Sequence, residues 1–192
     1  MNTNLINILK NNGIVVLATD TLYGIVGNAH SQTIVERIYT IKGRDENKPF
    51  IILIPSIAAL DSFGITLTEK DRQFLETVWP GAVTVILPIV PSHYGQLAYL
   101  HRGTNELAFR LPNKASLRSL LEQVGPLVAP SANPQSFEPA YTIAQAQEYF
   151  GTTIDHYEDE GEVRGEPSTI VRLKDGAPTI VRQGAVSLNL DK

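Results

Sequence analysis

Two groups of polar residues, far apart in the sequence, could together bind an anionic substrate. Lys42 and Arg44 are separated by one glycine and follow an apolar-periodic segment, and Ser131-Ala132-Asn133 lies between two prolines. Arginine supplies a planar fork for phosphate oxygens, and lysine supplies a compact positive charge. Each group also has an ordinary structural explanation, because cations are favoured at helix C-termini and Ser-x-Asn triplets are typical of turns. Neither group by itself indicates a binding site.

The sequence has none of the glycine-rich fingerprints that bind nucleotide phosphates. Gly24 and Gly27 form neither a phosphate loop nor a dinucleotide motif. A bound nucleotide would therefore be held by side chains and turn amides, and Lys42 and Arg44 are candidates. The four histidines show no metal-ligand spacing and there is no cysteine, so we predict no metal site built from protein ligands.

The elements that must position these residues are predicted to form a mixed α/β sheet. Apolar runs bounded by turn residues predict strands at 14–18, 50–54, 83–87, 107–111 and 127–129. Apolar periodicity predicts helices at 5–9, 33–41, 68–78, 116–124 and 143–150. Residues 169–173 and 179–182 flank a turn and predict a hairpin. Strands that alternate with helices and also pair as hairpins indicate a mixed sheet.

Local signals also predict where the helix before Arg44 begins and ends. Thr33 and Glu36 have the spacing of a capping box, which favours a helix start there. Gly43 is expected to stop the helix. Lys42 and Arg44 would then lie on one loop, at 42–49, which leads into the strand at 50–54.

Length and composition indicate one folded domain over residues 1–192. The chain is 43% apolar and 19% charged, which is typical of a packed protein and not of a disordered one. Its net charge of −4 argues against a surface devoted to nucleic acid but allows a local basic cleft. The first apolar segment, 5–9, is too short for a signal peptide or a membrane span. We therefore expect a cytoplasmic protein with no membrane association.

Seven short segments, in the same order, resemble the YrdC/Sua5/TsaC family of L-threonylcarbamoyladenylate synthases. They are Thr19–Gly24, Lys42–Pro49, Trp79–Thr84, Leu107–Pro112, Ala129–Asn133, Pro167–Val171 and Val181–Ala185. An ordered set of matches is far more specific than any one of them. The resemblance implies the YrdC-like α/β fold, a twisted mixed sheet flanked by helices around a concave cationic cleft, in its short single-domain form.

The resemblance also implies roles for individual residues. Lys42 and Arg44 match catalytic positions. Threonine-binding positions are matched by Thr21, Arg110, Ser131 and Ser168. ATP-binding positions are matched by Lys42, Arg44, Lys48, Asn133, Tyr141, Thr142 and Arg182. Arg110 could clamp the carboxylate of the amino acid through two hydrogen bonds.

Several positions depart from the family pattern. Lys48 stands where the family usually has asparagine, Leu53 stands where it often has histidine, and Asp20 replaces the commoner glutamate. After the Ser-x-Asn triplet, an apparent one-residue insertion leaves Tyr141 and Thr142 as alternatives for a single ATP contact.

The implied reaction converts L-threonine, bicarbonate or CO2, and ATP into threonylcarbamoyl-AMP and pyrophosphate, for the N6-threonylcarbamoyladenosine modification of tRNA. Mg²⁺ would accompany ATP, and a downstream threonylcarbamoyl-transferase complex would use the product. The alternative is an RNA-binding module of the same fold that uses the cationic cleft. The negative net charge and the few aromatic residues near the arginines count against it, so we expect RNA binding to be weak at most.

Overall fold

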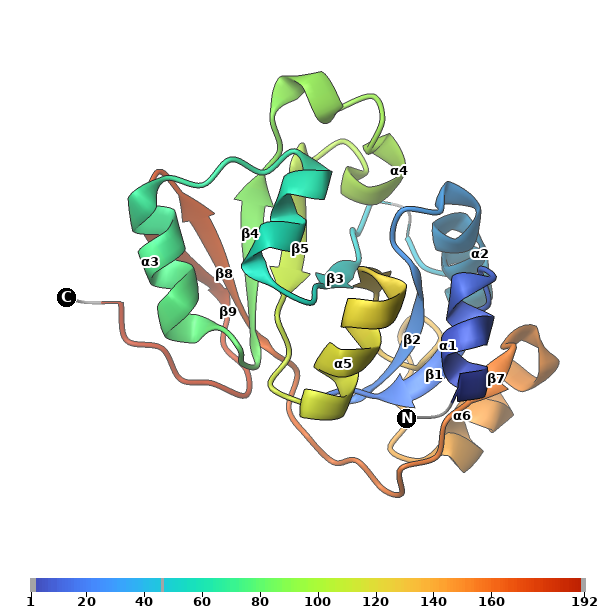
Figure 1. Cartoon of the computed structure of the whole chain (residues 1–192). Coiled ribbons are helices and arrows are strands. Elements are labelled where there is room, and N and C mark those ends of the chain that lie inside the picture. Colours follow the sequence, from blue (N-terminus) through green and yellow to red (C-terminus); the bar gives the residue numbers. More distant parts are fainter. Residues whose placement is uncertain (1–2, 46, 191–192) are drawn as a thin grey trace.

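The computed structural model describes residues 3–45 and 47–190, whose strands form one sheet (Figure 1). Within these residues the sheet has nine strands, in the order β7-β1-β2-β6-β3-β5-β4-β8-β9. Their bounds are β1 Val15–Ala18, β2 Tyr23–Asn28, β3 Ile51–Leu53, β4 Val83–Pro88, β5 Glu106–Arg110, β6 Leu127–Val128, β7 His156–Tyr157, β8 Thr169–Lys174 and β9 Ala177–Arg182. The pairs β1–β7, β3–β5 and β4–β8 are parallel and the other pairs are antiparallel, which confirms the predicted mixed sheet.

Short helices connect the strands and flank the sheet. The α-helices are α1 Thr3–Lys10, α2 Gln32–Lys42, α3 Glu69–Val78, α4 Ala98–His101, α5 Ala115–Val124 and α6 Ile143–Phe150. The 3-10 helices are η1 Ile57–Phe63, η2 Pro91–His93 and η3 Gly151–Thr153. In Figure 1 the sheet extends from β7 on the right to β9 on the left, with α1, α2 and α6 on the right and α3 on the left. None of the helices within 3–45 and 47–190 is long and apolar enough to cross a membrane.

Strand β1 is buried on both faces, as its continuous apolar run predicts. Successive side chains of a strand point to opposite faces. Val15 and Leu17 join leucines of α1 and α5 in the smaller hydrophobic core, and Val16 joins the larger core with Ile38 of α2. Packing on both sides fixes β1, and with it the position of the Thr19–Thr21 turn at its end.

The start of α2 differs from the sequence-based expectation. Ser31, and not Thr33, is the N-cap, and its side chain makes no capping hydrogen bond. The carbonyl of Ser31 accepts hydrogen bonds from the amides of Ile34 and Val35, so helical bonding starts before Thr33. A turn at Asn28, whose carbonyl accepts from the Ser31 amide, leads the chain into the helix at this earlier point.

Gly43 ends α2, as predicted. Its φ of 55° lies in the left-handed region that glycine adopts without strain, and its amide donates to the Thr40 carbonyl. The next amide, of Arg44, turns back to the Tyr39 carbonyl. The loop therefore begins at Gly43, and Lys42 is the last residue of the helix, which corrects the expectation that Lys42 lies on the loop.

Candidate active site

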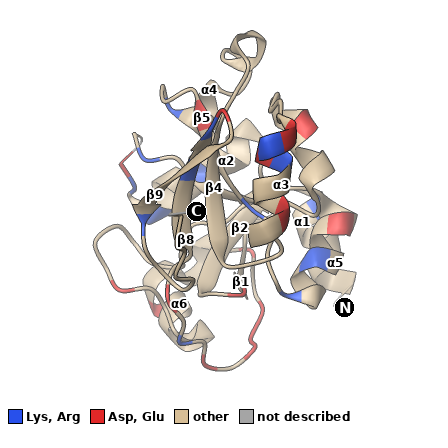
Figure 2. Ribbon diagram, turned by 90° about the vertical axis from the view of Figure 1, so that its left-hand side faces the viewer, with Lys and Arg blue, Asp and Glu red and all other residues tan. Residues whose placement is uncertain are grey.

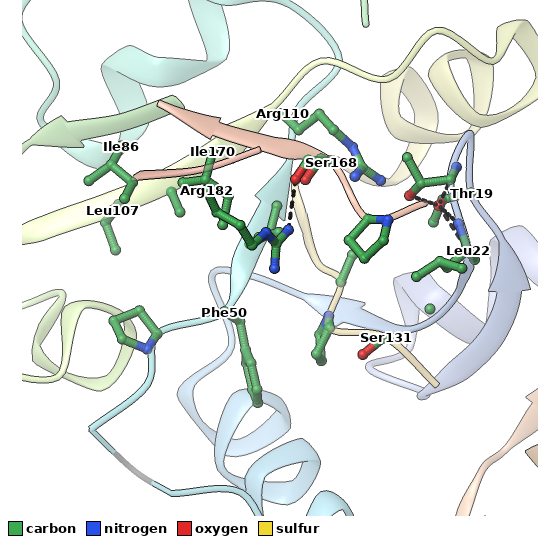
Figure 3. Close-up of a pocket in the computed structure, with 18 of the residues that line it drawn as sticks. Thr19, Leu22, Phe50, Ile86, Leu107, Arg110, Ser131, Ser168, Ile170 and Arg182 are labelled. Atoms are coloured by element: carbon green, nitrogen blue, oxygen red, sulfur yellow. Dashed lines mark hydrogen bonds between the residues drawn. The ribbon is translucent and has the colours of Figure 1, made fainter. Parts of the chain in front are cut away.

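A cleft of about 370 Å³ opens beside β3, β5, β4 and β8 (Figure 3). Six predicted site residues line it, from six separate parts of the chain: Thr21, Arg44, Arg110, Ser131, Ser168 and Arg182. Five predicted residues do not appear in the described lining: Lys42, Lys48, Asn133, Tyr141 and Thr142. The fold thus brings together the predicted threonine-binding residues and both predicted ATP-binding arginines.

Strand alternation selects which side chains reach the cleft. From β5, the alternate residues Glu106, Ala108 and Arg110 line the cleft together with Leu107, and Phe109 is buried in the larger core. Ala108 lies opposite Ile86 of β4, which also lines the cleft. This two-residue period is why a charged arginine can follow directly after a core phenylalanine.

Arg110 is a buried cation that faces the cleft. Its side chain is 4% exposed, and its Nη2 lies 3.1 Å from Oδ1 of Asp20, whose own exposure is 7%. The other carboxylate oxygen of Asp20 accepts a hydrogen bond of 2.9 Å from the Asn113 amide. Burial lowers the pKa of Arg110 and the Asp20 carboxylate opposes that shift, so the guanidinium stays protonated.

The ion pair between Arg110 and Asp20 leaves some of their hydrogen-bond donors and acceptors without a partner. Within the described residues, Arg110 Nε and Asp20 Oδ1 are buried and have no hydrogen-bond partner, and the contact of Oδ1 with Nη2 of Arg110 is an ion pair only. A buried donor without a partner costs about 1–3 kcal/mol. A carboxylate that entered the cleft could satisfy this donor.

Ser168 and Arg182 meet on the same side of the cleft. Ser168 Oγ lies 2.8 Å from Oγ1 of Thr84, a buried polar contact between the start of β8 and β4. Arg182 donates from Nη2 to the Ser168 carbonyl at 2.7 Å (Figure 3). The serine is thereby fixed next to a guanidinium that remains accessible from the cleft.

A β-bulge directs Arg182 toward the cleft. The pairing of β8 with β9 shifts by one residue, so that Ile170 lies opposite Arg182 and Val181 is the extra residue. Opposite residues of an antiparallel pair point to the same face, and Ile170 lines the cleft. Val181 is exposed instead. Without the bulge, Val181 would take the position that Arg182 occupies.

The turn after β1 holds Thr21 at the cleft. Thr19 Oγ1 accepts from the Thr21 amide at 3.1 Å, donates to the Leu22 carbonyl at 2.7 Å, and lies 3.1 Å from Thr21 Oγ1. The segment leading to β8 crosses this turn closely. A Cβ added at Gly165 would lie 2.1 Å from the Thr21 carbonyl oxygen, so only glycine fits there.

The Ser131–Asn133 turn presents one of its two polar side chains to the cleft. Ser131 forms an isolated bridge to Gly24, and its Oγ donates to Asn133 Oδ1 at 2.6 Å. Asn133 Nδ2 donates to the Phe137 carbonyl at 2.6 Å, so this amide stabilises its own turn. Contact between Asn133 and ATP stays a prediction.

Lys42 is buried beneath this turn and is only 3% exposed. Its ammonium donates to the Ser131 carbonyl at 2.5 Å and to the Asn133 carbonyl, and Asn133 Oδ1 lies 3.5 Å away. Burial, with a smaller contribution from the charge of Arg44, lowers the pKa of Lys42 to about 7. Lys42 therefore connects the end of α2 to the Ser-Ala-Asn turn, and its catalytic role stays a prediction.

Arg44 points from the loop into the cleft lining. Its Nε donates to the Lys48 carbonyl at 3.0 Å, and its guanidinium carbon lies 5.3 Å from the centre of the Phe50 ring. Burial lowers the pKa of Arg44, although an arginine remains charged. The side chain of Lys48 is 60% exposed and outside the lining, so only its backbone supports Arg44 here.

The two alternatives for the remaining ATP contact, Tyr141 and Thr142, have structural roles. Thr142 is the N-cap of α6 and accepts a hydrogen bond of 3.3 Å from the Gln145 amide. The Tyr141 ring lies beneath the guanidinium of Arg164, 4.8 Å from its centre. Neither residue lines the cleft, so their contact with ATP stays a prediction.

The described lining carries far more positive than negative charge. Four arginines line it, Arg44, Arg110, Arg172 and Arg182, against one carboxylate, Glu106. Elsewhere the charges are mixed, and Figure 2 shows basic and acidic segments scattered over helices and loops alike. A cleft of this kind suits a small anionic ligand better than the long backbone of a nucleic acid.

Sequence reasoning missed several residues of the cleft. Glu106, Arg172, Phe50 and Thr84 were not predicted, yet the first three line the cleft and Thr84 contacts Ser168. Thr84 could have been noticed as a polar residue within the apolar run 83–87. Asp20 was noted only as a departure from the family pattern, because its partner Arg110 is far away in the sequence.

Comparison with known proteins shows which proteins this chain resembles. The family model for Sua5, YciO and YrdC proteins, described as "Telomere recombination", matches residues 7–184. The chain is 32% identical over 181 residues to a putative threonylcarbamoyl-AMP synthase of Mycobacterium leprae, covering 94% of this chain and 81% of that protein. It is 31% identical to the threonylcarbamoyl-AMP synthase of Bacillus subtilis, covering 94% of this chain but only 52% of that longer protein.

A solved structure shows the same fold. The crystal structure of Sua5 from Pyrococcus abyssi, complexed with L-threonine, superimposes with a TM-score of 0.83 at 29% identity. The match covers 94% of this chain and 53% of the Pyrococcus chain. The predicted twisted mixed sheet flanked by helices is therefore confirmed. Because the family model and the relatives span nearly the whole sequence, the chain belongs to the Sua5/YciO/YrdC family.

Proposed function

We propose that this protein is a threonylcarbamoyl-AMP synthase, a nucleotidyltransferase that joins L-threonine, bicarbonate or CO2, and ATP. The observation that carries this proposal is the buried Arg110, whose Nε–H lacks a partner within the described residues and lies in a cleft that also contains Arg44 and Arg182. The guanidinium of Arg110 could donate hydrogen bonds to an amino-acid carboxylate, and Arg44 and Arg182 could pair with phosphates. The M. leprae and B. subtilis relatives carry the name of this activity.

The reaction requires three anionic groups to converge. The amine of threonine attacks CO2, forms an N–C bond and loses a proton, which gives a carbamate. A carbamate oxygen then attacks the α-phosphorus of ATP, the bond from that phosphorus to the β-phosphate oxygen breaks, and pyrophosphate leaves. Fixed cations offset the repulsion between carboxylate, carbamate and triphosphate and stabilise the transition state.

We propose a part for each of the predicted site residues in this reaction. Arg110, with Ser168 and Thr21 near it, would hold threonine. Ser131 would also contact threonine, and Arg44 and Arg182 would contact the phosphates. Lys42 would act through the Ser131 turn that it holds, because its amine is bonded to that backbone.

We expect the phosphates of ATP, and not protein side chains, to bring Mg²⁺ into the cleft. No cluster of three or more metal-ligating His, Cys, Asp or Glu side chains occurs within 3–45 and 47–190, and the cleft carboxylate Glu106 is engaged by Arg172. Mg²⁺ would therefore enter with ATP, held by phosphate oxygens and water. It would neutralise part of the triphosphate charge.

The product would be used by a second enzyme. An acyl-adenylate is an activated carbonyl compound, so a threonylcarbamoyl-transferase complex would accept it and modify adenosine in tRNA. The RNA-binding alternative has no observation in its favour, since basic and acidic segments are intermixed outside the cleft (Figure 2).

Pyrophosphate release is the test of this function. The protein with MgATP, L-threonine and bicarbonate should release pyrophosphate, because all three substrates are needed to form the mixed anhydride. Leaving out threonine or bicarbonate should each reduce release to background. Release that continues at the same rate without threonine would mean that the protein hydrolyses ATP and is not this synthase.

Selectivity for threonine over serine should be modest. The two amino acids differ by one methyl group, which a pocket can use for only about 1–3 kcal/mol. Competition between them, followed by mass spectrometry of the two adenylates, should give a preference below about 200-fold. A much larger preference would point to a contact beyond those with Thr21, Arg110 and Ser168.

A further inference from the structure

Two stacked aromatic rings connect α2 to the loop that carries Arg44. The rings of Tyr39, in α2, and Phe50, just before β3, have centroids 4.0 Å apart at an interplanar angle of 20°. Both residues are buried, but only Phe50 belongs to the described lining of the cleft. Figure 3 shows its side chain pointing away from Arg182. The proposed reaction uses neither ring directly.

An arginine packs against each member of this aromatic pair. The guanidinium carbon of Arg44 lies 5.3 Å from the centre of the Phe50 ring, and that of Arg102 lies 4.1 Å from the centre of the Tyr39 ring. Arg102 is the C-cap of α4, and its Nη2 donates to Glu36 of α2 at 2.8 Å. A cation is attracted to an aromatic face, and more strongly where water is excluded. These contacts form a continuous series that ends at the cleft: Arg102, Tyr39, Phe50 and Arg44.

The Tyr39 hydroxyl and the Arg44 guanidinium share one hydrogen-bond acceptor. The hydroxyl donates to the Lys48 carbonyl at 3.0 Å, and Nε of Arg44 donates to the same oxygen at 3.0 Å. A carbonyl oxygen has two lone pairs, so it can accept both donors. Packing of the core does not require this hydroxyl, because phenylalanine would fill the same space. The tyrosine therefore fixes the carbonyl that orients Arg44.

We infer that Tyr39 and Phe50 are positioning residues for Arg44. Phe50 supports the guanidinium, and Tyr39 fixes the Lys48 carbonyl that holds its Nε. The inference rests on the proposed function, in which Arg44 contacts the phosphates of ATP. A fixed cation stabilises a transition state best when it need not reorganise during the reaction. A free arginine side chain would lose rotamer freedom on contact with the phosphates, and the buried rings restrict that freedom beforehand.

The turnover of Tyr39→Phe tests this inference. The variant keeps the ring, and the Lys48 carbonyl keeps Arg44 as a donor, so the Tm should stay close to that of the wild type. The kcat for pyrophosphate release should fall roughly two- to tenfold, the contribution of one neutral hydrogen bond. The KM for threonine should not change, because Tyr39 acts on Arg44 and not on Arg110. A wild-type kcat would overturn the inference.

The double variant Tyr39→Phe/Arg44→Ala separates positioning from a purely structural role. If the hydroxyl acts through Arg44, its removal should lower kcat no further once Arg44 is replaced. Additive losses would mean that Tyr39 supports activity by another route, and would overturn the inference. Tyr99→Phe is the matched control, since Tyr99 also donates to a backbone carbonyl, that of Ala29, at 3.0 Å and outside the described lining. It should keep the wild-type kcat.

A measurement without substrates makes the test independent of the proposed function. NMR relaxation of the Arg44 Nε–H group should give a lower order parameter in Tyr39→Phe than in the wild type, and an unchanged one in Tyr99→Phe. An unchanged order parameter in Tyr39→Phe would mean that the hydroxyl does not hold Arg44. Pyrophosphate release that does not depend on threonine would instead reject the synthase proposal, and the order parameters would still decide whether Tyr39 positions Arg44.

Discussion

Arg110→Lys is expected to raise the KM for threonine by roughly ten- to hundredfold while the protein stays folded. Lysine can keep the ion pair with Asp20, but it lacks the planar fork that binds a carboxylate through two hydrogen bonds. A charge-assisted hydrogen bond contributes about 1.5–3 kcal/mol, and each 1.4 kcal/mol is about tenfold. Initial rates of pyrophosphate release at varied threonine, with ATP and bicarbonate saturating, measure this effect.

Arg110→Gln should have a second consequence, because it leaves the Asp20 carboxylate buried without a cation. Removing one partner of a buried ion pair typically costs about 3–5 kcal/mol, so the Tm of this variant should fall clearly below that of Arg110→Lys. Arg37→Lys is the matched control, since Arg37 pairs with Asp155 in a more exposed position outside the cleft. A wild-type KM for threonine in Arg110→Lys would remove Arg110 from the threonine site.

The sequence predicted most elements because their signals are local. The apolar run of β1, the hydrophobic faces of α3, α5 and α6, and the hairpin β8–β9 each depend on residues close in the chain. Strand β2 was missed because its two glycines interrupt the apolar pattern. The two-residue β7 was missed because it exists only through its pairing with β1.

The candidate site residues come from family resemblance, and their contacts with distant residues could not be predicted from the sequence. No local pattern indicates that Asp20 pairs with Arg110, or that an extra residue in β9 turns Arg182 toward the cleft. Lys42 and Arg44 look equivalent in the sequence, but the left-handed turn at Gly43 separates them. One is buried under the Ser131 turn and the other lines the cleft.

Because Lys42 and Arg44 occupy different environments, we expect Arg44→Ala and Lys42→Met to differ in their effects on stability. Arg44→Ala should lower kcat by about 10²–10³, the loss expected for one contact to the transition state, with little change in Tm because it bonds to carbonyls of its own loop. Lys42→Met should also lower kcat, through relaxation of the Ser131–Asn133 turn. Unlike Arg44→Ala, it should alter how stability depends on pH.

The sign of this pH effect follows from the lowered pKa of Lys42, about 7 in the folded protein against an ordinary value of 10.5. Between these values the unfolded chain binds a proton that the folded protein has released, so the free energy of unfolding rises with pH. The slope from this one group is at most about 1.4 kcal/mol per pH unit, and it vanishes below both pKa values. Lys42→Met lacks this contribution, so its stability relative to the wild type should fall as the pH rises from 7 toward 10.

Urea unfolding of the wild type and the variant at several pH values from 6 to 9.5 measures the difference directly. Lys10→Met, which removes an exposed lysine at the end of α1, should follow the wild type throughout. If the free energy of unfolding changes with pH in the same way in Lys42→Met and in the wild type, the Lys42 ammonium keeps its proton in the folded state. The three carbonyl oxygens around it would then outweigh its burial, and Lys42 would be a permanent cation beneath the Ser-Ala-Asn turn.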